Sequence, residues 1–170
     1  MRDEWFERSL VLLCQHDEDG AIGLVINREG DIPIQEVMER LSSEHGDMGH
    51  IPDGIRKTWW GGPVGDGAGF VIFPGEVRDG EGWNIGGVAV SPSVERLAQL
   101  VRGGKGFNLC LGYAGWGPGQ LASEIELGSW LAVDVDPQIV FETPIEERYE
   151  KALALLGLTP QSIWMTPINE

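Results

Sequence analysis

The chain has few residues that carry cationic, thiol or imidazole chemistry. It contains 12 Lys and Arg against 27 Asp and Glu, which gives a net charge of −15, with two cysteines and three histidines. Such a charge repels phosphate backbones and anionic lipid surfaces, so we expect no direct nucleic-acid binding. The sequence also lacks a charged segment followed by a long apolar stretch, and its apolar runs are shorter than the ~18 residues of a membrane span. We therefore expect a cytoplasmic protein without membrane association.

The two cysteines, Cys14 and Cys110, lie in short apolar runs that resemble strands. A thiol in such a run behaves as a small hydrophobic side chain. We expect both to be free and buried rather than joined in a disulfide.

A chain of 170 residues with 42% hydrophobic content can build one full core. The chain is too short to form two domains that each have a full hydrophobic core, so we predict a single domain over residues 1–170. We find no internal repeat, linker or low-complexity tract.

Short apolar runs separated by polar or glycine-containing turns predict strands. The expected strands cover residues 9–14, 21–27, 57–62, 69–74, 86–91 and 107–114, with one or two more in 129–143, interrupted at Asp136 and Pro137. The first two are joined by a hairpin turn. Because the strands come in groups and do not alternate strictly with helices, the pattern favours a mixed or largely antiparallel sheet and an α+β fold.

Helical periodicity and end signals predict four helices. They begin with residues 34–41, with Pro33 at the first helical position, and continue with a helix capped by Ser91 and ended by Gly103. A short helix over 117–128 and a last one follow, the last opened by a Thr143 to Glu146 capping box and closed by Gly157. Residues 42–54 are expected to form the most mobile surface loop, and residues 159–165 a final turn.

The stretch "CLGYAGWGPGQLASEI", residues 110–125, resembles the glycine loops that grip phosphates or present nucleophiles. A P-loop needs Lys and Ser or Thr where this chain has Pro118 and Gly119, and a dinucleotide loop needs glycine where it has Gln120. A nucleophile elbow would place Gly117 at the reactive position. We therefore expect no phosphate binding, no cofactor and no catalytic residue here.

Two interpretations of this stretch remain open. In one, a buried strand turns sharply at residues 112–115, Gly117 with Pro118 starts a helix, and the Gln120 side chain folds back on the Gly117 amide. In the other, "WWGGP" and "GYAGWGPG" form a shared groove for a peptide or small ligand. The residues of that candidate groove are Trp59, Trp60, Gly61, Gly62, Pro63, Tyr113, Gly115, Trp116, Gly117, Gln120 and Glu124. The tryptophans suit either a core or a binding wall.

A metal site can be drawn from the histidines and their acidic neighbours, but the spacing does not favour one. His45 and His50 are five residues apart in an expected loop without cysteine, with Glu44, Asp47 and Asp53 nearby. We expect no metal. His16 is expected to be a turn residue and not a base.

Three motifs together resemble the YqgE/AlgH family of bacterial proteins. They are "GAIGLVIN" (20–27), "WGGPV" (60–64) and "LGYAGWGPGQLASEI" (111–125), and their order and spacing match over nearly the whole chain. The resemblance implies one α+β domain whose sheet curls into a partial barrel with helices packed outside. It also implies a label of transcriptional regulator, without an established activity or catalytic residues. Family members carry a further apolar strand ahead of the segment that begins here at Met1. The resemblance therefore does not decide which strand forms the first edge of the sheet.

The resemblance and the acidic surface together favour a non-enzymatic regulatory or interaction module. It would act through a protein partner or a small ligand, with an indirect effect on transcription. The alternative is a hydrolase or transferase that uses the Gly/Trp-lined groove. The sequence identifies neither the partner nor the oligomeric state.

Overall fold

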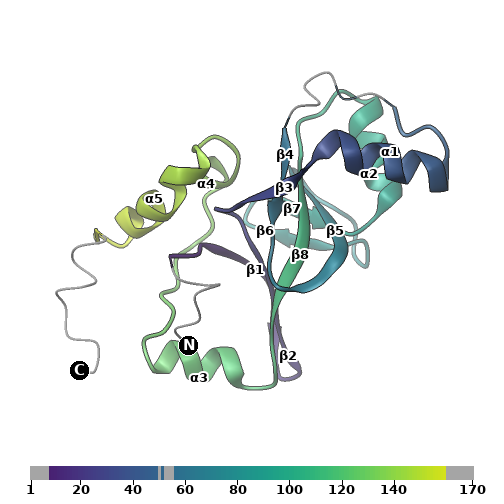
Figure 1. Ribbon diagram of the computed structural model, residues 1–170. Helices are drawn as coiled ribbons and strands as arrows, with labels where there is room; N and C mark the ends of the chain where they lie inside the picture. The colour runs from purple at the N-terminus through teal and green to yellow at the C-terminus, as the bar shows by residue number, and fades with distance from the viewer. Residues whose placement is uncertain (1–7, 50, 52–55, 160–170) are drawn as a thin grey trace.

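The computed structural model describes residues 8–49, 51 and 56–159, which form a nearly closed barrel with helices packed outside (Figure 1). The strands are β1 (Val11–Asp17), β2 (Gly20–Val25), β3 (Glu29–Pro33), β4 (Lys57–Trp60), β5 (Val64–Pro74), β6 (Trp83–Ile85), β7 (Val88–Ser91) and β8 (Asn108–Trp116). The helices are α1 (Ile34–His45), α2 (Val94–Arg102), α3 (Gln120–Glu126), α4 (Pro137–Phe141) and α5 (Arg148–Leu155), with a 3₁₀ turn at Ile145–Glu147. The α+β class and the curled sheet are confirmed.

Six of the eight strands follow the order β1-β2-β8-β5-β7-β6, while β4 pairs with β8 and β3 pairs with β4. Their pairings are antiparallel except that of β4 with β8. The edge strands β1 and β6 approach each other, where the Trp83 indole N–H donates to Gln15 Oε1 at 3.2 Å. This bond bridges the seam that leaves the barrel open.

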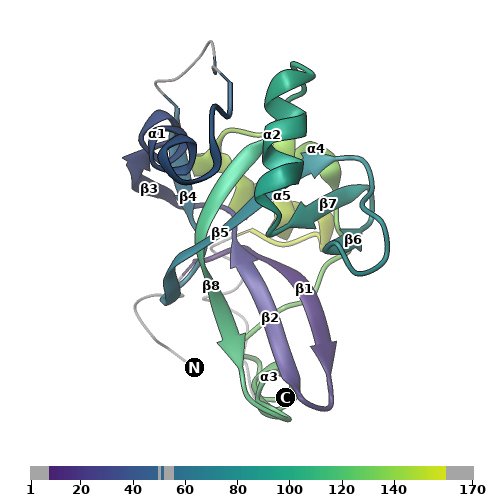
Figure 2. The ribbon, with the colours of Figure 1, turned by 90° about the vertical axis from the view of Figure 1, so that its right-hand side faces the viewer.

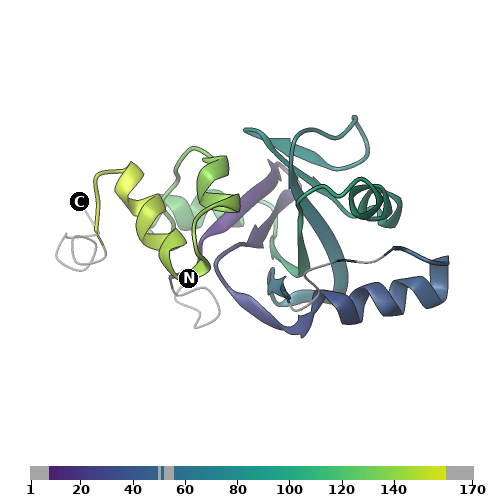
Figure 3. The same ribbon diagram turned by 90° about the horizontal axis from the view of Figure 1, so that it is seen from above.

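Three clusters of buried side chains form the core. The first packs α1 and α2 on β5 and β7 through Met38, Val71 and Leu97, and the second fills the barrel. The third lies beneath α3, where the β1–β2 hairpin and the end of β8 extend away from the barrel (Figure 2). Helices α4 and α5 lie on the side of the molecule opposite α1, as the view from above shows (Figure 3).

Arg148 attaches α5 to the barrel. Its guanidinium lies 4.5 Å from the Trp59 ring centre, donates to the Ile26 carbonyl, and donates to the Thr143 carbonyl at 2.9 Å. Burial lowers the pKa of Arg148 to about 10. No local sequence signal indicates this buried cation, because Ile26 and Trp59 are distant in the chain and the nearby partner, Thr143, contributes only a backbone carbonyl.

The predicted hairpin is confirmed, and the predicted loop over 42–54 is partly wrong. Helix α1 continues to His45, and Met48 and Ile51 are buried in the core between α1 and α2. Because Met48 and Ile51 are apolar, burying their side chains in the core is more favourable than exposing them in a mobile loop. Pro33 ends β3 and precedes the helix, instead of being its first residue. Residues 50 and 52–54 lie outside the described part.

The strand prediction for 129–143 is wrong. Residues 130–136 have no regular structure, and α4 follows with Asp136 as its N-cap, whose carboxylate accepts from the Gln138 amide at 3.0 Å. An Asp-Pro pair serves equally well as a strand break or as a helix start, and here it starts a helix. The short strands β3 and β6 were not predicted.

Two predicted helix caps are also wrong. Ser93, not Ser91, caps α2, because Ser91 ends β7 and its hydroxyl donates to the Glu81 carbonyl. The Thr143 capping box does not form, since the Thr143 hydroxyl bonds the Gln138 carbonyl and a 3₁₀ turn precedes α5. The predicted final turn over 159–165 lies outside the described residues apart from Thr159.

Candidate functional site

Strands β4 and β8 bring the two glycine motifs of the candidate groove side by side. Trp59 pairs with Cys110 and Trp60 with Leu111 in a parallel register. Beyond the strand end, the Gly61 amide donates to the Leu111 carbonyl at 2.8 Å, and the Gly61 carbonyl accepts from Val25 at 2.9 Å. The motifs therefore meet in space as the groove hypothesis requires.

Their contact is made by backbone against backbone. A Cβ atom placed on Gly61 would lie 2.2 Å from the Gly112 carbonyl oxygen, and one on Gly62 would lie 2.1 Å from the Tyr113 carbonyl carbon. Gly112 has a φ of +79°, so β8 bends there and continues. The sharp turn predicted at residues 112–115 is therefore wrong, because β8 runs on to Trp116.

Two of the three tryptophans in these motifs belong to the core. Trp59 is 4% exposed and Trp116 is 7% exposed. Trp60 is half-buried, with the Arg28 guanidinium 5.2 Å from its ring centre. Tyr113, also half-buried, packs edge-on against Phe70 at 6.2 Å. The core interpretation is confirmed for Trp59 and Trp116, whereas the groove itself stays a prediction.

The exposed residues among those of the candidate groove are Pro63, Gly115 and Gly117. Gly115 pairs with Ile22 of β2, and Gly117 precedes α3. The cap of α3 is Gly119, with a φ of +74°, and not Gly117 as predicted.

A polar network fixes α3 to the segment that follows it. Gln120 accepts from the Gly117 amide at 2.9 Å, which confirms the predicted fold-back, and donates to Glu124 Oε2 at 2.9 Å. Glu124 is 8% exposed, and its Oε1 accepts from the Trp130 indole at 3.0 Å. Trp130 meets Trp116 edge-on at 5.7 Å. Each oxygen of the buried Glu124 thus has a neutral donor, which suits a structural role.

Both cysteines are free, as expected; the predicted burial is confirmed for Cys110 and wrong for Cys14, which is half-buried. Burial raises the pKa of Cys14 to about 12 and also raises that of Cys110. Both are therefore thiols and not nucleophilic thiolates near neutral pH.

The candidate metal ligands lie mostly apart or outside the described residues. His45 Nε2 is 3.8 Å from Glu44 Oε2, while His50 and Asp53 are not described. His16 pairs with Ala21 within the hairpin strands and not in the turn. In the described part of the chain no three of His, Cys, Asp and Glu come together as a metal site would require.

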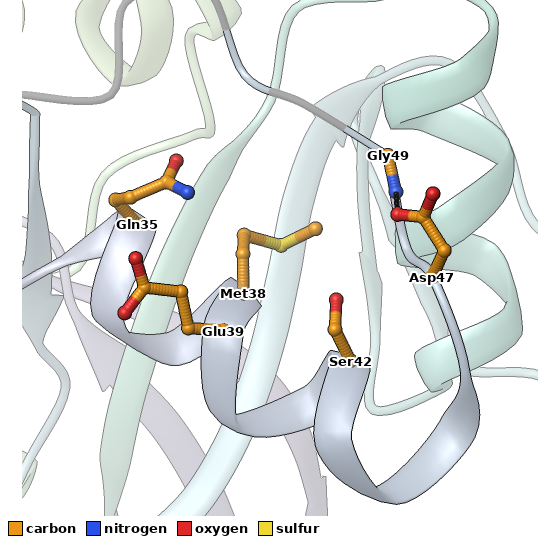
Figure 4. A pocket seen from close by; sticks show the side chains of 6 residues that line it. All are labelled: Gln35, Met38, Glu39, Ser42, Asp47 and Gly49. Atoms are coloured by element: carbon orange, nitrogen blue, oxygen red, sulfur yellow. Dashed lines mark hydrogen bonds between the residues drawn. The ribbon is translucent and has the colours of Figure 1, made fainter.

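A hollow of about 440 Å³ lies beside α1, which the sequence did not indicate (Figure 4). It is lined by Gln35, Met38, Glu39, Ser42, Asp47 and Gly49. Gln35 Oε1 is buried there without a hydrogen-bond partner among the described residues. The Ser42 hydroxyl accepts from the Met48 amide at 3.2 Å, and Asp47 accepts from the Gly49 amide at 2.9 Å. The lining offers acceptors but pairs no nucleophile with a base.

A third feature is an acidic, leucine-bearing surface on α3 and the chain after it. Leu127 is 72% exposed, Leu131 is 53% exposed, and Ile125 on α3 is exposed too. From Gly106 to Glu147 the sequence holds no Lys or Arg. The sequence does contain these signals, but apolar residues in an expected helix or strand, as at Ile125, Leu127 and Leu131, are ordinarily assigned to the core.

Fold and site together define a barrel-like α+β protein whose glycine motifs are used in backbone packing. No helix in the described residues has the length and apolar character needed to cross a membrane. A family model described as AlgH-like matches residues 1–161, and the chain belongs to that family.

Relatives and solved structures agree with this assignment. UPF0301 proteins of Burkholderia mallei and Burkholderia thailandensis are 43% identical over 168 residues, covering 94% of this chain and 84% of theirs. The solution structure of the AlgH protein from Pseudomonas aeruginosa is similar with a TM-score of 0.77 and 33% identity, over 98% of this chain and 88% of that one. A Corynebacterium diphtheriae protein of 21% identity, with a TM-score of 0.69 over 98% of this chain and 86% of its own, shares the fold.

Proposed function

We propose that this protein is a non-enzymatic interaction module that acts through protein partners in the cytoplasm, with any effect on transcription indirect. The observation that carries the proposal is the leucine-bearing surface of residues 125–131, which lies within a stretch of chain, residues 106–147, without Lys or Arg. Single exposed leucines are ordinary on soluble proteins, but here three large apolar side chains are exposed within seven residues of chain, which favours an apolar surface patch. Such patches with polar surroundings are typical of protein interfaces.

The packing of the glycine motifs in the fold supports the same proposal. Gly61, Gly62 and Gly112 bring two strands into contact, and Glu124 is engaged by two neutral donors. These contacts give the motif residues a structural role, so no catalytic role is needed to explain them. The alternative, a hydrolase or transferase, gains no paired nucleophile and base from this arrangement.

Site-specific photocrosslinking tests the proposal. A benzophenone amino acid is placed at Leu127 or Leu131, and at Glu39 on α1 as the control on the other side of the molecule. We expect discrete crosslinks to one protein from the two leucine positions in cells, and none of that product from Glu39. Absence of any crosslink from the leucine positions would contradict the proposal. So would turnover of ester, phosphoester or peptide substrates that is lost on changing Tyr113, Trp116 or Glu124.

A further inference from the structure

The segment between α3 and α4, residues 127–136, is a connector whose middle part, residues 131–135, has no backbone hydrogen bond to any residue that the structure describes. After the turn that ends α3, where the Ser129 amide donates to the Glu124 carbonyl at 2.9 Å, residues 131–135 run without a turn or bend. They make no hydrogen bond, through backbone or side chain, with any residue that the structure describes. Figure 1 shows this connector rising from α3 along the side of the molecule to α4.

The connector is held at its two ends. At the start, Trp130 donates to Glu124 and packs on Trp116. At the other end, Val135 lies against Gly86, where an added Cβ would be 3.2 Å away, and Asp136 caps α4. A segment fixed at both ends has already lost much of the conformational entropy that strand pairing costs.

Its sequence is that of a strand. In "WLAVDV" the residues Trp130, Val133 and Val135 favour a strand, as the sequence predicts for this stretch, and yet no strand of the described residues pairs with residues 131–135. The N–H and C=O groups of residues 131–135 have no partner among the described residues, and such a segment is a template for an added strand.

The charge of the chain on both sides of the connector indicates what charge a partner segment would carry. The 42 residues from Gly106 to Glu147 contain seven carboxylates and no Lys or Arg. Asp134 is exposed in the middle of the connector, close in sequence to the exposed Leu131. A complementary segment would carry Lys or Arg with interspersed apolar residues.

We infer that residues 131–135 receive an extended, basic segment of a protein partner as an added β-strand. The inference rests on the proposed interaction function and names the partner's chemistry and binding mode. Main-chain hydrogen bonds to the connector would supply affinity, while Asp134 and Leu131 would select lysine-rich, apolar-containing segments.

Fluorescence anisotropy with defined peptides tests the binding mode. The probe is a labelled peptide of about ten residues in which lysine alternates with valine. Two further peptides are N-methylated on alternate residues, one along each edge, which removes the amide donors of that edge alone. We expect the unmodified peptide to bind, one methylated peptide to bind about tenfold more weakly or worse, and the other to retain binding. Equal binding of all three would overturn strand addition.

Charge-matched variants test the place of binding. Asp134→Lys and Glu39→Lys change the net charge equally, the second on α1 at the far side of the molecule, and neither side chain has a bonded partner in the described residues. We expect Asp134→Lys to weaken peptide binding about tenfold or more and Glu39→Lys to change it less than about twofold. Equal losses would show binding by net charge alone and overturn the inference.

The two proposals can fail separately. Crosslinks from Leu127 together with no binding of the lysine peptide would leave an interaction module with another mode of recognition. Peptide binding that ignores Asp134 and N-methylation would overturn the inference and leave the crosslinking result unaffected.

Discussion

At the scale of single residues, the glycines of the family motifs act through the absence of a side chain. Gly61 has an ordinary φ, so its requirement is steric: the Gly112 carbonyl oxygen and the Cys110 sulfur occupy the space where a Cβ would lie. Gly112 has a positive φ of +79°, and a Cβ placed on it would collide with the Gly62 carbonyl oxygen. The motif spacing of "WGGPV" and "LGYAGWG" thus reflects the register of β4 on β8.

Gly61→Ala is expected to destabilise the protein by about 2–3 kcal/mol, because the added methyl group meets backbone that cannot move aside cheaply. Gly106→Ala is the matched control, since Gly106 has no atom within 4 Å of its would-be Cβ and needs no positive φ. Urea unfolding of the two variants measures the difference. Equal midpoints would show that β4 and β8 are further apart than described here.

The two thiols are expected to be slow towards an aromatic disulfide reagent at pH 8 in the folded protein. Burial raises the pKa of Cys14 to about 12 and that of Cys110 further, so the thiolate fraction is very small. After unfolding in guanidinium, both cysteines should react at the rate of a free thiol. Rapid labelling of either cysteine in native protein, followed by mass spectrometry, would contradict this prediction.

At the scale of elements, α3 is a short helix whose buried face carries a charged residue. Glu124 reaches Gln120 on its own helix and Trp130 beyond it, so the network joins α3 to the connector. Helix α3 is too short to be stable alone, and its position therefore depends on these contacts and on Leu121 in the core.

Glu124→Gln is expected to destabilise the protein by about 1–3 kcal/mol, because one end of an amide would face a donor whichever way it is turned. Glu126→Gln, on the exposed side of the same helix, is the control and should change stability by less than about 0.5 kcal/mol. Thermal unfolding followed by Trp fluorescence measures both. A similar effect of the two substitutions would show that the network contributes nothing.

The elements also show how far the sequence predicts this fold. The β1–β2 hairpin and α2 follow from local signals: a polar turn between apolar runs, and a periodic stripe ended by Gly103. The connector fails as a predicted strand because β-propensity cannot report whether a partner strand is present. The groove residues could be named from motif spacing, but their close backbone packing depends on a parallel β4–β8 pairing between distant segments.

At the scale of the whole molecule, positive charge is unevenly placed along the chain. The residues from Gly106 to Glu147 form β8, α3, the connector and α4 without one Lys or Arg, while the helices α1 and α2 each carry basic residues. One side of the molecule, bearing α3 and the connector, is thereby acidic by composition (Figure 1). The next basic residues along the chain are Arg148, which is buried, and Lys151, both of α5, so a polyanion approaching that side meets mostly carboxylates.

The whole-molecule charge of −15 leads to the last prediction, that the protein shows no specific affinity for double-stranded DNA at physiological salt. Specific and non-specific DNA binding both draw on release of counterions by Lys and Arg, and a surface dominated by carboxylates releases few and adds repulsion. An electrophoretic mobility shift assay with the promoter DNA of its own operon, at about 0.15 M and at about 0.05 M salt, should show no retarded band. A lysine-rich DNA-binding protein in the same assay serves as the positive control. A retarded band that resists competitor DNA and weakens steeply with salt would contradict the prediction.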